Sequence, residues 1–121
     1  MNVAVLGASD NPEKYAHQAI VRLKSKGHHV FPVNPTLKEV EGLPVFASLK
    51  DIPDSIDTIS MYVSKEKSDR LADEIMTKSP RRIIFNPGAE NPALEARAKA
   101  AGIRTLEACT LVMLSTDQFD G

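Results

Sequence analysis

The feature that most constrains the fold is a regular alternation of short apolar segments with longer segments of helical periodicity. The apolar segments predict strands over residues 2–7, 28–33, 43–46, 56–63, 82–85 and 103–107. Helices are predicted from residue 13 or 14 to 25, from 64 to 78 and from 91 to 102, with a brief helix or turn over 48–52. Alternation of this kind implies right-handed crossovers and a parallel sheet covered on both faces. We therefore predict an α/β domain with a doubly wound, mainly parallel sheet and helices on both faces, a Rossmann-like architecture.

Residues that begin and end helices support these boundaries. Ser64 and Asn91 are suited to cap helices, and Pro92 follows Asn91 at the first helical position, where its missing N–H costs nothing. Gly27 is suited to end the first helix. Pro32 cannot donate to a strand ladder, so the second strand is predicted to end near it.

Length and composition narrow the class of protein. A chain of 121 residues predicts a single domain, over residues 1–121. The net charge of -1 gives no electrostatic footprint for nucleic acid. No signal peptide or membrane-length apolar run is visible, and Cys109, the one cysteine, excludes an internal disulfide and a multi-cysteine metal site. These features predict a cytoplasmic protein that binds neither membrane nor nucleic acid.

The loops that follow the predicted strands carry the main functional signal. In sheets of this kind the ligand lies outside the carboxyl ends of the strands, where the strand order reverses. Four loops meet there, over residues 7–11, 33–35, 63–65 and 86–89. Three of them are built from small residues, Asn, Pro or Gly, which allow a ligand to approach the backbone.

The first loop, "GASDN", is suited to hold phosphate. Gly7 allows a sharp turn after the strand, and Ala8 and Ser9 keep the side chains short. A phosphate would then approach backbone N–H groups and the positive end of the next helix, with the Ser9 hydroxyl and Lys14 as further donors. A single glycine is a weak signal, and a tight strand-to-helix connection explains the same residues.

The second loop argues against a conventional NAD site. Such sites place an Asp or Glu about 20 residues after the glycines, where it binds the ribose 2′-hydroxyl. Here the segment "GHHVFPVNPT" has no acidic residue, and the first one to follow is Glu39. Asn34 and Pro35 form a neutral corner suited to line an adenine or ribose with room for an extra phosphate. A strand that simply ends at proline is the alternative.

Five segments in register carry a family resemblance. They are "VLGASDNPEKYAHQAI", "GHHVFPVNP", "EGLPVFASLKDIPDSID", "NPGAEN" and "AGIRTLEACTLVML". Together they resemble the small CoA-binding proteins, a family similar to the CoA-binding domain of the succinyl-CoA synthetase alpha subunit. The match covers nearly the whole chain.

The resemblance implies CoA or acyl-CoA as the ligand, and it assigns roles to the four loops. The phosphates would lie against Gly7, Ala8, Ser9 and Lys14, the adenosine against Val33, Asn34 and Pro35, the nucleotide against Val63 and Ser64, and the pantetheine against Asn86, Pro87 and Gly88. The synthetase works through a phosphohistidine in a second domain that this chain lacks. The resemblance therefore implies binding and not the synthetase reaction.

No catalytic constellation is visible in the sequence. His17 lies in the first helix near the phosphate loop, where solvent exposure or a local hydrogen bond is expected, with donation to a ligand as the alternative. Cys109, after the last strand, is expected to pack; the second interpretation is that it faces the pantetheine thiol and forms a reversible mixed disulfide with it. The basic run of Lys65, Lys67 and Arg70 is expected to be a solvated helix face, with attraction of CoA phosphates as the second interpretation.

Three hypotheses follow from these residues. The first is a CoA or acyl-CoA binding module without catalysis of its own. The second is an NAD(P)-dependent oxidoreductase, for which Lys38 is a weak partner for a 2′-phosphate. The third is a protein-interaction subunit whose nucleotide site has decayed. The apolar tail Leu111–Leu114 suits either a homodimer contact or packing against the sheet.

Overall fold

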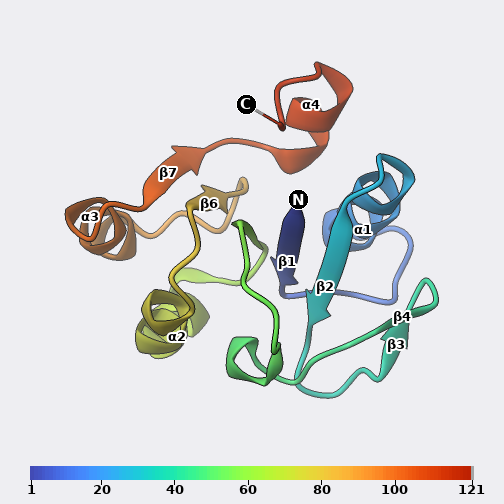
Figure 1. Cartoon of the computed structure of the whole chain (residues 1–121), viewed down its shortest axis with the longest axis horizontal. Helices are drawn as coiled ribbons and strands as arrows, with labels where there is room; N and C mark the ends of the chain where they lie inside the picture. The colour runs from blue at the N-terminus through green and yellow to red at the C-terminus, as the bar shows by residue number, and fades with distance from the viewer. Residues whose placement is uncertain (121) are drawn as a thin grey trace.

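Five parallel strands form the central sheet of the computed structural model, which describes residues 1–120 (Figure 1). The strands are β1 (Asn2–Leu6), β2 (His29–Val33), β5 (Thr58–Met61), β6 (Arg82–Phe85) and β7 (Arg104–Glu107), in the order β2-β1-β5-β6-β7. The helices are α1 (Tyr15–Ser25), α2 (Lys65–Lys78), α3 (Pro92–Ala100) and α4 (Thr110–Ser115). Within residues 1–120 every helix is too short or too polar to cross a bilayer. The predicted α/β class and parallel sheet are confirmed.

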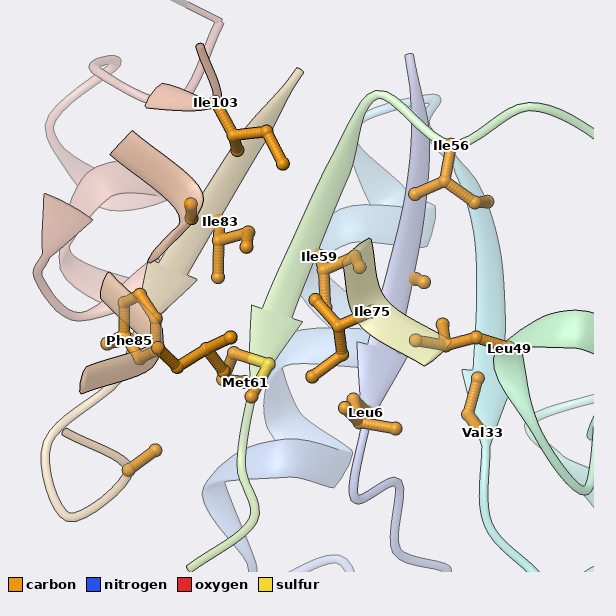
Figure 2. Packing of buried hydrophobic residues seen from close by; sticks show 14 of the residues in the cluster. Leu6, Val33, Leu49, Ile56, Ile59, Met61, Ile75, Ile83, Phe85 and Ile103 are labelled. Carbon is orange, nitrogen blue, oxygen red and sulfur yellow. The ribbon is translucent and has the colours of Figure 1, made fainter. Parts of the chain in front are cut away.

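Alternate residues of each strand enter different hydrophobic clusters, because successive side chains point to opposite faces of a sheet. Leu6, Ile59 and Ile83 pack beneath α2, α3 and the 3-10 helix η1 (Leu49–Asp51), and Figure 2 shows Ile75 of α2 lying over this face. Val3 and Ile84 face the other way, toward α1 and α4. The sheet is therefore covered on both faces, which is the doubly wound arrangement.

The strand order reverses between β1 and β5. From β1 the chain passes through α1 to β2 at one edge of the sheet, then returns to the other side of β1 to form β5. Leu6 is in register with Val33 of β2 and with Met61 of β5, so the three strands end at the same level. The loops after these strands therefore meet at one rim, which is the switch point of the fold.

The prediction of a strand over residues 43–46 is correct only in part. Glu39–Val40 (β3) and Leu43–Pro44 (β4) form a separate two-stranded hairpin, beside the end of β2 in Figure 1. Its two turn residues, Glu41 and Gly42, both have positive φ, 50° and 75°. This is the backbone of a tight hairpin, but Glu-Gly is a weaker signal than Asn-Gly, and the sequence did not reveal it.

β2 ends at Val33, one residue after Pro32, as predicted, and Pro32 itself belongs to the strand. The Pro32 carbonyl accepts a hydrogen bond from Phe46 N–H at 2.9 Å, on the side of β2 that faces away from β1. The missing N–H points to the same outer side, where no strand of the central sheet follows. An edge strand can accommodate proline there without losing a ladder hydrogen bond.

Both predicted helix caps are confirmed. Ser64 Oγ accepts a hydrogen bond from Lys67 N–H at 3.3 Å, and Asn91 Oδ1 accepts one from Leu94 N–H at 3.1 Å. The apolar tail forms α4, whose residues Met113 and Leu114 pack in the same cluster as α1. The tail therefore packs against the sheet, one of the two predicted roles.

His28 links the start of β2 to the end of the described chain. Its side chain is 8% exposed, packs edge-on against Phe119 with ring centroids 5.1 Å apart, and lies 3.3 Å from the Asp120 carboxylate. Burial, helped by the positive N-terminus, lowers the pKa of His28 below its ordinary value of 6.5, because the exposed Asp120 offsets these effects only in part.

Acidification should therefore destabilise the fold through His28. Unfolded chains take up a proton on this side chain near pH 6.5, whereas the folded chain takes it up only at lower pH, so stability falls as the pH drops below about 6.5. We expect a smaller drop in the urea midpoint from pH 7.5 to 5.5 for His28→Gln than for the wild type. His29→Gln, at an exposed position, is the control and should keep the wild-type pH dependence. Equal pH dependence in wild type and His28→Gln would contradict this account.

Candidate functional site

A cleft of about 270 Å³ opens at the switch point, between the ends of β1, β2 and β5 and the side of α2. Five of the predicted site residues line it, although they come from three separate loops: Gly7, Val33, Asn34, Pro35 and Val63. The carboxyl ends of parallel strands lie at the same edge of a sheet. The common register of β1, β2 and β5 also brings the three loops that follow these strands to the same level.

The walls of this cleft are mainly apolar. Leu6 and Val33 come from strand ends, and Leu49 and Leu71 are contributed by η1 and α2. Whole small ligands usually occupy pockets of roughly 300–1,000 Å³, so a smaller apolar cleft suits one part of a ligand, such as a planar base. Sequence reasoning missed Leu49 and Leu71 as site residues, because neither stands after a strand of the central sheet.

Asn34 braces two of the loops. Its Nδ2 donates to the Ala8 carbonyl at 2.9 Å, and its Oδ1 accepts from the backbone N–H groups of Thr36 and Leu37 at 2.9 and 3.0 Å. The amide thus has partners at both ends before any ligand arrives. Asn34 lines the cleft as predicted by position, and its side chain fixes the shape of the corner.

A second recess lies on the other side of the first loop. Gly7, Ser9 and Lys14 line it together with Tyr62, which follows β5. Burial raises the pKa of Tyr62 to about 12, so its phenol is protonated at neutral pH. Gly7 belongs to both recesses, which makes the first loop the partition between them.

Some backbone N–H groups of this loop form hydrogen bonds within the protein, and others do not. The N–H groups of Gly7 and Ala8 both donate to the Val33 carbonyl, at 3.1 and 3.0 Å, so they are not available to a phosphate. Within residues 1–120 the N–H groups of Ser9 and Asp10 make no such bond. Of the loop N–H groups that were predicted to bind phosphate, those of Ser9 and Asp10 are therefore the ones left for a ligand, because Asn11 N–H donates to Ser9 Oγ.

The N-terminus of α1 faces the same loop and lacks a side-chain cap. Lys14 holds the N-cap position without a capping hydrogen bond, whereas Ser64 and Asn91 cap α2 and α3. The first turn of α1 also contains no acidic residue. Free N–H groups and the helix dipole make such an end attractive to an anion.

His17 fixes the first loop from the side of α1. Its Nδ1 lies 2.9 Å from the Ser9 carbonyl, which can only accept, so this nitrogen carries a proton and donates. The side chain is buried and its Nε2 lies 3.9 Å from Glu41. Of the two expectations for His17, the local hydrogen bond is confirmed and solvent exposure is wrong.

Asn86 does not face the rim, contrary to the predicted contact with pantetheine. Its side chain is 1% exposed, and Nδ2 donates to Ser60 Oγ at 3.0 Å and to the Met61 carbonyl at 2.8 Å. Its Oδ1 accepts from Thr110 N–H at 2.8 Å, at the start of α4. The amide therefore joins β5, β6 and α4. Pro87 and Gly88, the next residues, are exposed.

Of the remaining candidate residues, some have structural roles and others line the cleft. Ser64 is occupied as the cap of α2, and Cys109 is partly buried at the N-cap position of α4. Lys65 is paired with Asp69, Nζ to Oδ2 at 3.1 Å, so it belongs to a solvated helix face as expected. Lys67 and Arg70, from the same basic run, line the cleft.

Relatives of known sequence include parts of larger enzymes. The chain is 32% identical over 74 residues to the uncharacterized protein YneT of Bacillus subtilis strain 168, covering 61% of this chain and 55% of that protein. It is 37% identical over 65 residues to the alpha subunit of acetate–CoA ligase (ADP-forming) II of Pyrococcus furiosus, covering 53% of this chain and 14% of the subunit. The chain thus spans about half the length of the first relative and a small part of the second.

Solved structures share the fold over most of the chain. A crystal structure of an uncharacterized protein superposes with a TM-score of 0.88 at 36% identity, covering 98% of this chain and 97% of the other. The dinucleotide-forming acetyl-coenzyme A synthetase 1 of Candidatus Korarchaeum cryptofilum, in complex with phosphate and ADP, gives 0.75 at 30% identity, covering 88% and 25%. A family model described as a CoA binding domain matches residues 1–115. With the parallel sheet and the rim described above, this match shows that the chain belongs to the CoA-binding domain family.

Proposed function

We propose that this chain binds CoA or an acyl-CoA at the switch-point rim and holds it without catalysing a reaction of its own. The observation that carries the proposal is the cleft, where loops from three strands converge in a chain of the CoA-binding domain family. The apolar walls formed by Leu6, Val33 and Leu71 would take the adenine ring. Pro35 and Val63 would border the ribose.

The phosphates would lie across the first loop, in the second recess. Ser9 supplies a backbone N–H and a hydroxyl whose oxygen already accepts from Asn11 N–H at 3.0 Å, which leaves the hydroxyl proton to donate. Lys14, exposed beside this recess, supplies a mobile cation. The uncapped end of α1 adds its dipole and its free N–H groups. Together these groups suit a pyrophosphate.

The pantetheine arm would leave the rim past Pro87 and Gly88, which are exposed beside the end of β6. Among residues 1–120 no three His, Cys, Asp or Glu side chains come together as a metal site. His17, the histidine beside the first loop, is committed to the Ser9 carbonyl. The chain would therefore present CoA to chemistry performed by another domain or subunit, as expected for a binding module.

Calorimetric titration of the purified chain with CoA, acetyl-CoA, NAD and NADP tests the proposal. We expect saturable binding of CoA or acetyl-CoA and none of NAD, since the second loop lacks the acidic residue that NAD sites use. Binding of NADP without either CoA compound would overturn the proposal. Native mass spectrometry of gently purified protein would identify any ligand that it retains.

Filling the cleft should weaken this binding without disturbing the fold. Ala47 is exposed at the cleft wall, so a tryptophan there can occupy the cleft with little strain. We expect Ala47→Trp to weaken CoA binding by about tenfold or more, because the ring would displace the adenine. Ala96→Trp, at an exposed position on α3, is the matched control and should bind CoA as the wild type does. Unchanged affinity in Ala47→Trp would place the ligand elsewhere.

A further inference from the structure

The cleft is lined by two cations and one carboxylate, Lys67, Arg70 and Glu74, which leaves it with a net positive charge. Lys67 and Arg70 lie three residues apart on α2, on the helix face that also presents Leu71 and Glu74 to the cleft. Neither cation forms an ion pair within residues 1–120, whereas Lys65 on the same helix is paired with Asp69. The Glu74 carboxylate is engaged through Oε1, which accepts from Lys50 N–H at 3.1 Å.

The opposite wall of the cleft has no charge. It is formed by the corner after β2, where Asn34 and Pro35 line the cleft and the Asn34 amide already has hydrogen-bond partners at both its nitrogen and its oxygen. In dinucleotide sites this corner carries the acid that binds a free ribose hydroxyl. Here the charged groups that line the cleft all come from α2, and two of the three, Lys67 and Arg70, are cations. A cation pair favours a ribose that carries a phosphate.

We infer that Lys67 and Arg70 bind the 3′-phosphate of CoA and make the site select CoA over dephospho-CoA. This inference rests on the proposed function, and it assigns the phosphate on the ribose to α2, separate from the pyrophosphate at the first loop. With the base held between Leu6, Val33 and Leu71, a phosphate on its ribose lies at the mouth of the cleft. A guanidinium and an ammonium side by side can share its oxygens, Arg through its paired N–H groups and Lys as a point charge.

The test compares CoA with dephospho-CoA on the wild type and on Lys67→Gln/Arg70→Gln. We expect the wild type to bind CoA about tenfold or more tightly than dephospho-CoA, since hydrogen bonds to charged groups are the strong ones. The double variant should lose this preference while its affinity for dephospho-CoA stays within about twofold. Both side chains are exposed, so the variant should fold normally.

Lys65→Gln/Lys99→Gln is the matched control. It removes the same charge from two lysines that are paired with Asp69 and Glu95 and do not line the cleft. This control should keep the wild-type preference for CoA over dephospho-CoA. That result would show that Lys67 and Arg70 act by direct contact with the phosphate and not through the overall charge of the protein. A loss of preference in this control equal to that in the double variant would overturn the inference.

Two further outcomes separate the inference from the proposed function. Equal affinity of the wild type for CoA and dephospho-CoA would overturn the inference and leave CoA binding intact. Binding of neither would overturn both. Adenosine 3′,5′-bisphosphate and adenosine 2′,5′-bisphosphate provide a check with the same charge, because the inference expects the 3′ isomer to bind more tightly. A preference for the 2′ isomer would contradict it.

Discussion

Replacing Gly7 with alanine should cost about 2–5 kcal/mol of folding stability, from backbone strain and steric overlap together. Gly7 has φ of +92°, a conformation that side chains oppose. A Cβ here would also lie 2.8 Å from the Tyr62 carbonyl oxygen and 2.9 Å from Val63 Cγ1. The Tyr62 N–H donates to the Leu6 carbonyl at 2.8 Å, so this backbone cannot move away freely. Urea unfolding measures the loss.

Gly27→Ala provides the control for strain alone. Gly27 has φ of +85°, and a Cβ there would meet nothing within 4 Å. We expect it to cost only about 1–2 kcal/mol, the penalty of the left-handed conformation. Equal losses of folding stability in Gly7→Ala and Gly27→Ala would mean that steric overlap with Tyr62 does not contribute to the effect at Gly7. Because Gly7 variants disturb the fold, their loss of CoA binding would not identify the site, and Ala47→Trp is the sharper test of binding.

Asn86→Ala should cost about 2–4 kcal/mol, because it leaves several buried groups without hydrogen-bond partners. The Met61 carbonyl would lose its side-chain donor, and Thr110 N–H would lose its acceptor at the start of α4. Ser60 Oγ would keep only Thr110 Oγ1, at 2.8 Å. The buried position gives water little access to replace the lost bonds. The free energy of unfolding in urea is the measurement.

Asn2→Ala removes an amide of the same kind from the surface. The Asn2 Nδ2 donates to the Ser55 carbonyl at 2.9 Å in an exposed position, where water can take over. We expect this change to cost no more than about 1 kcal/mol. If Asn86→Ala proved as mild as Asn2→Ala, the amide would be free to leave the core, and the predicted contact with pantetheine would regain support.

Local signals in the sequence predicted most of the elements. The four residues 82–85 form β6 as predicted, and Ser64 and Asn91 cap the helices that they were expected to cap. These features depend on residues within a few positions of one another, because a cap bonds to the next turn and a buried strand is a short apolar run. The Glu41-Gly42 hairpin was missed because its turn is a weak version of the same kind of signal.

The site was predictable to the extent that it follows from strand ends. Any parallel sheet brings the carboxyl ends of its strands to one edge, so Gly7, Asn34 and Val63 could be expected to meet before the strand order was known. The direction of each side chain could not be predicted in this way. Asn86 also follows a strand, but its amide turns inward because α4 returns to present the Thr110 N–H to it.

The sequence by itself determined the class of fold, the two helix caps at Ser64 and Asn91 and the absence of an acid immediately after the second strand. The tertiary structure alone decided the strand order, the burial of Asn86 and the rotation of α2 that brings Lys67 and Arg70 to the cleft. The physical reason is the distance along the chain over which each kind of interaction acts. Periodicity and capping act within one or two turns of chain, whereas the rotation of a helix is set by its packing on distant strands, as Ile75 packs with Ile59 and Met61 (Figure 2).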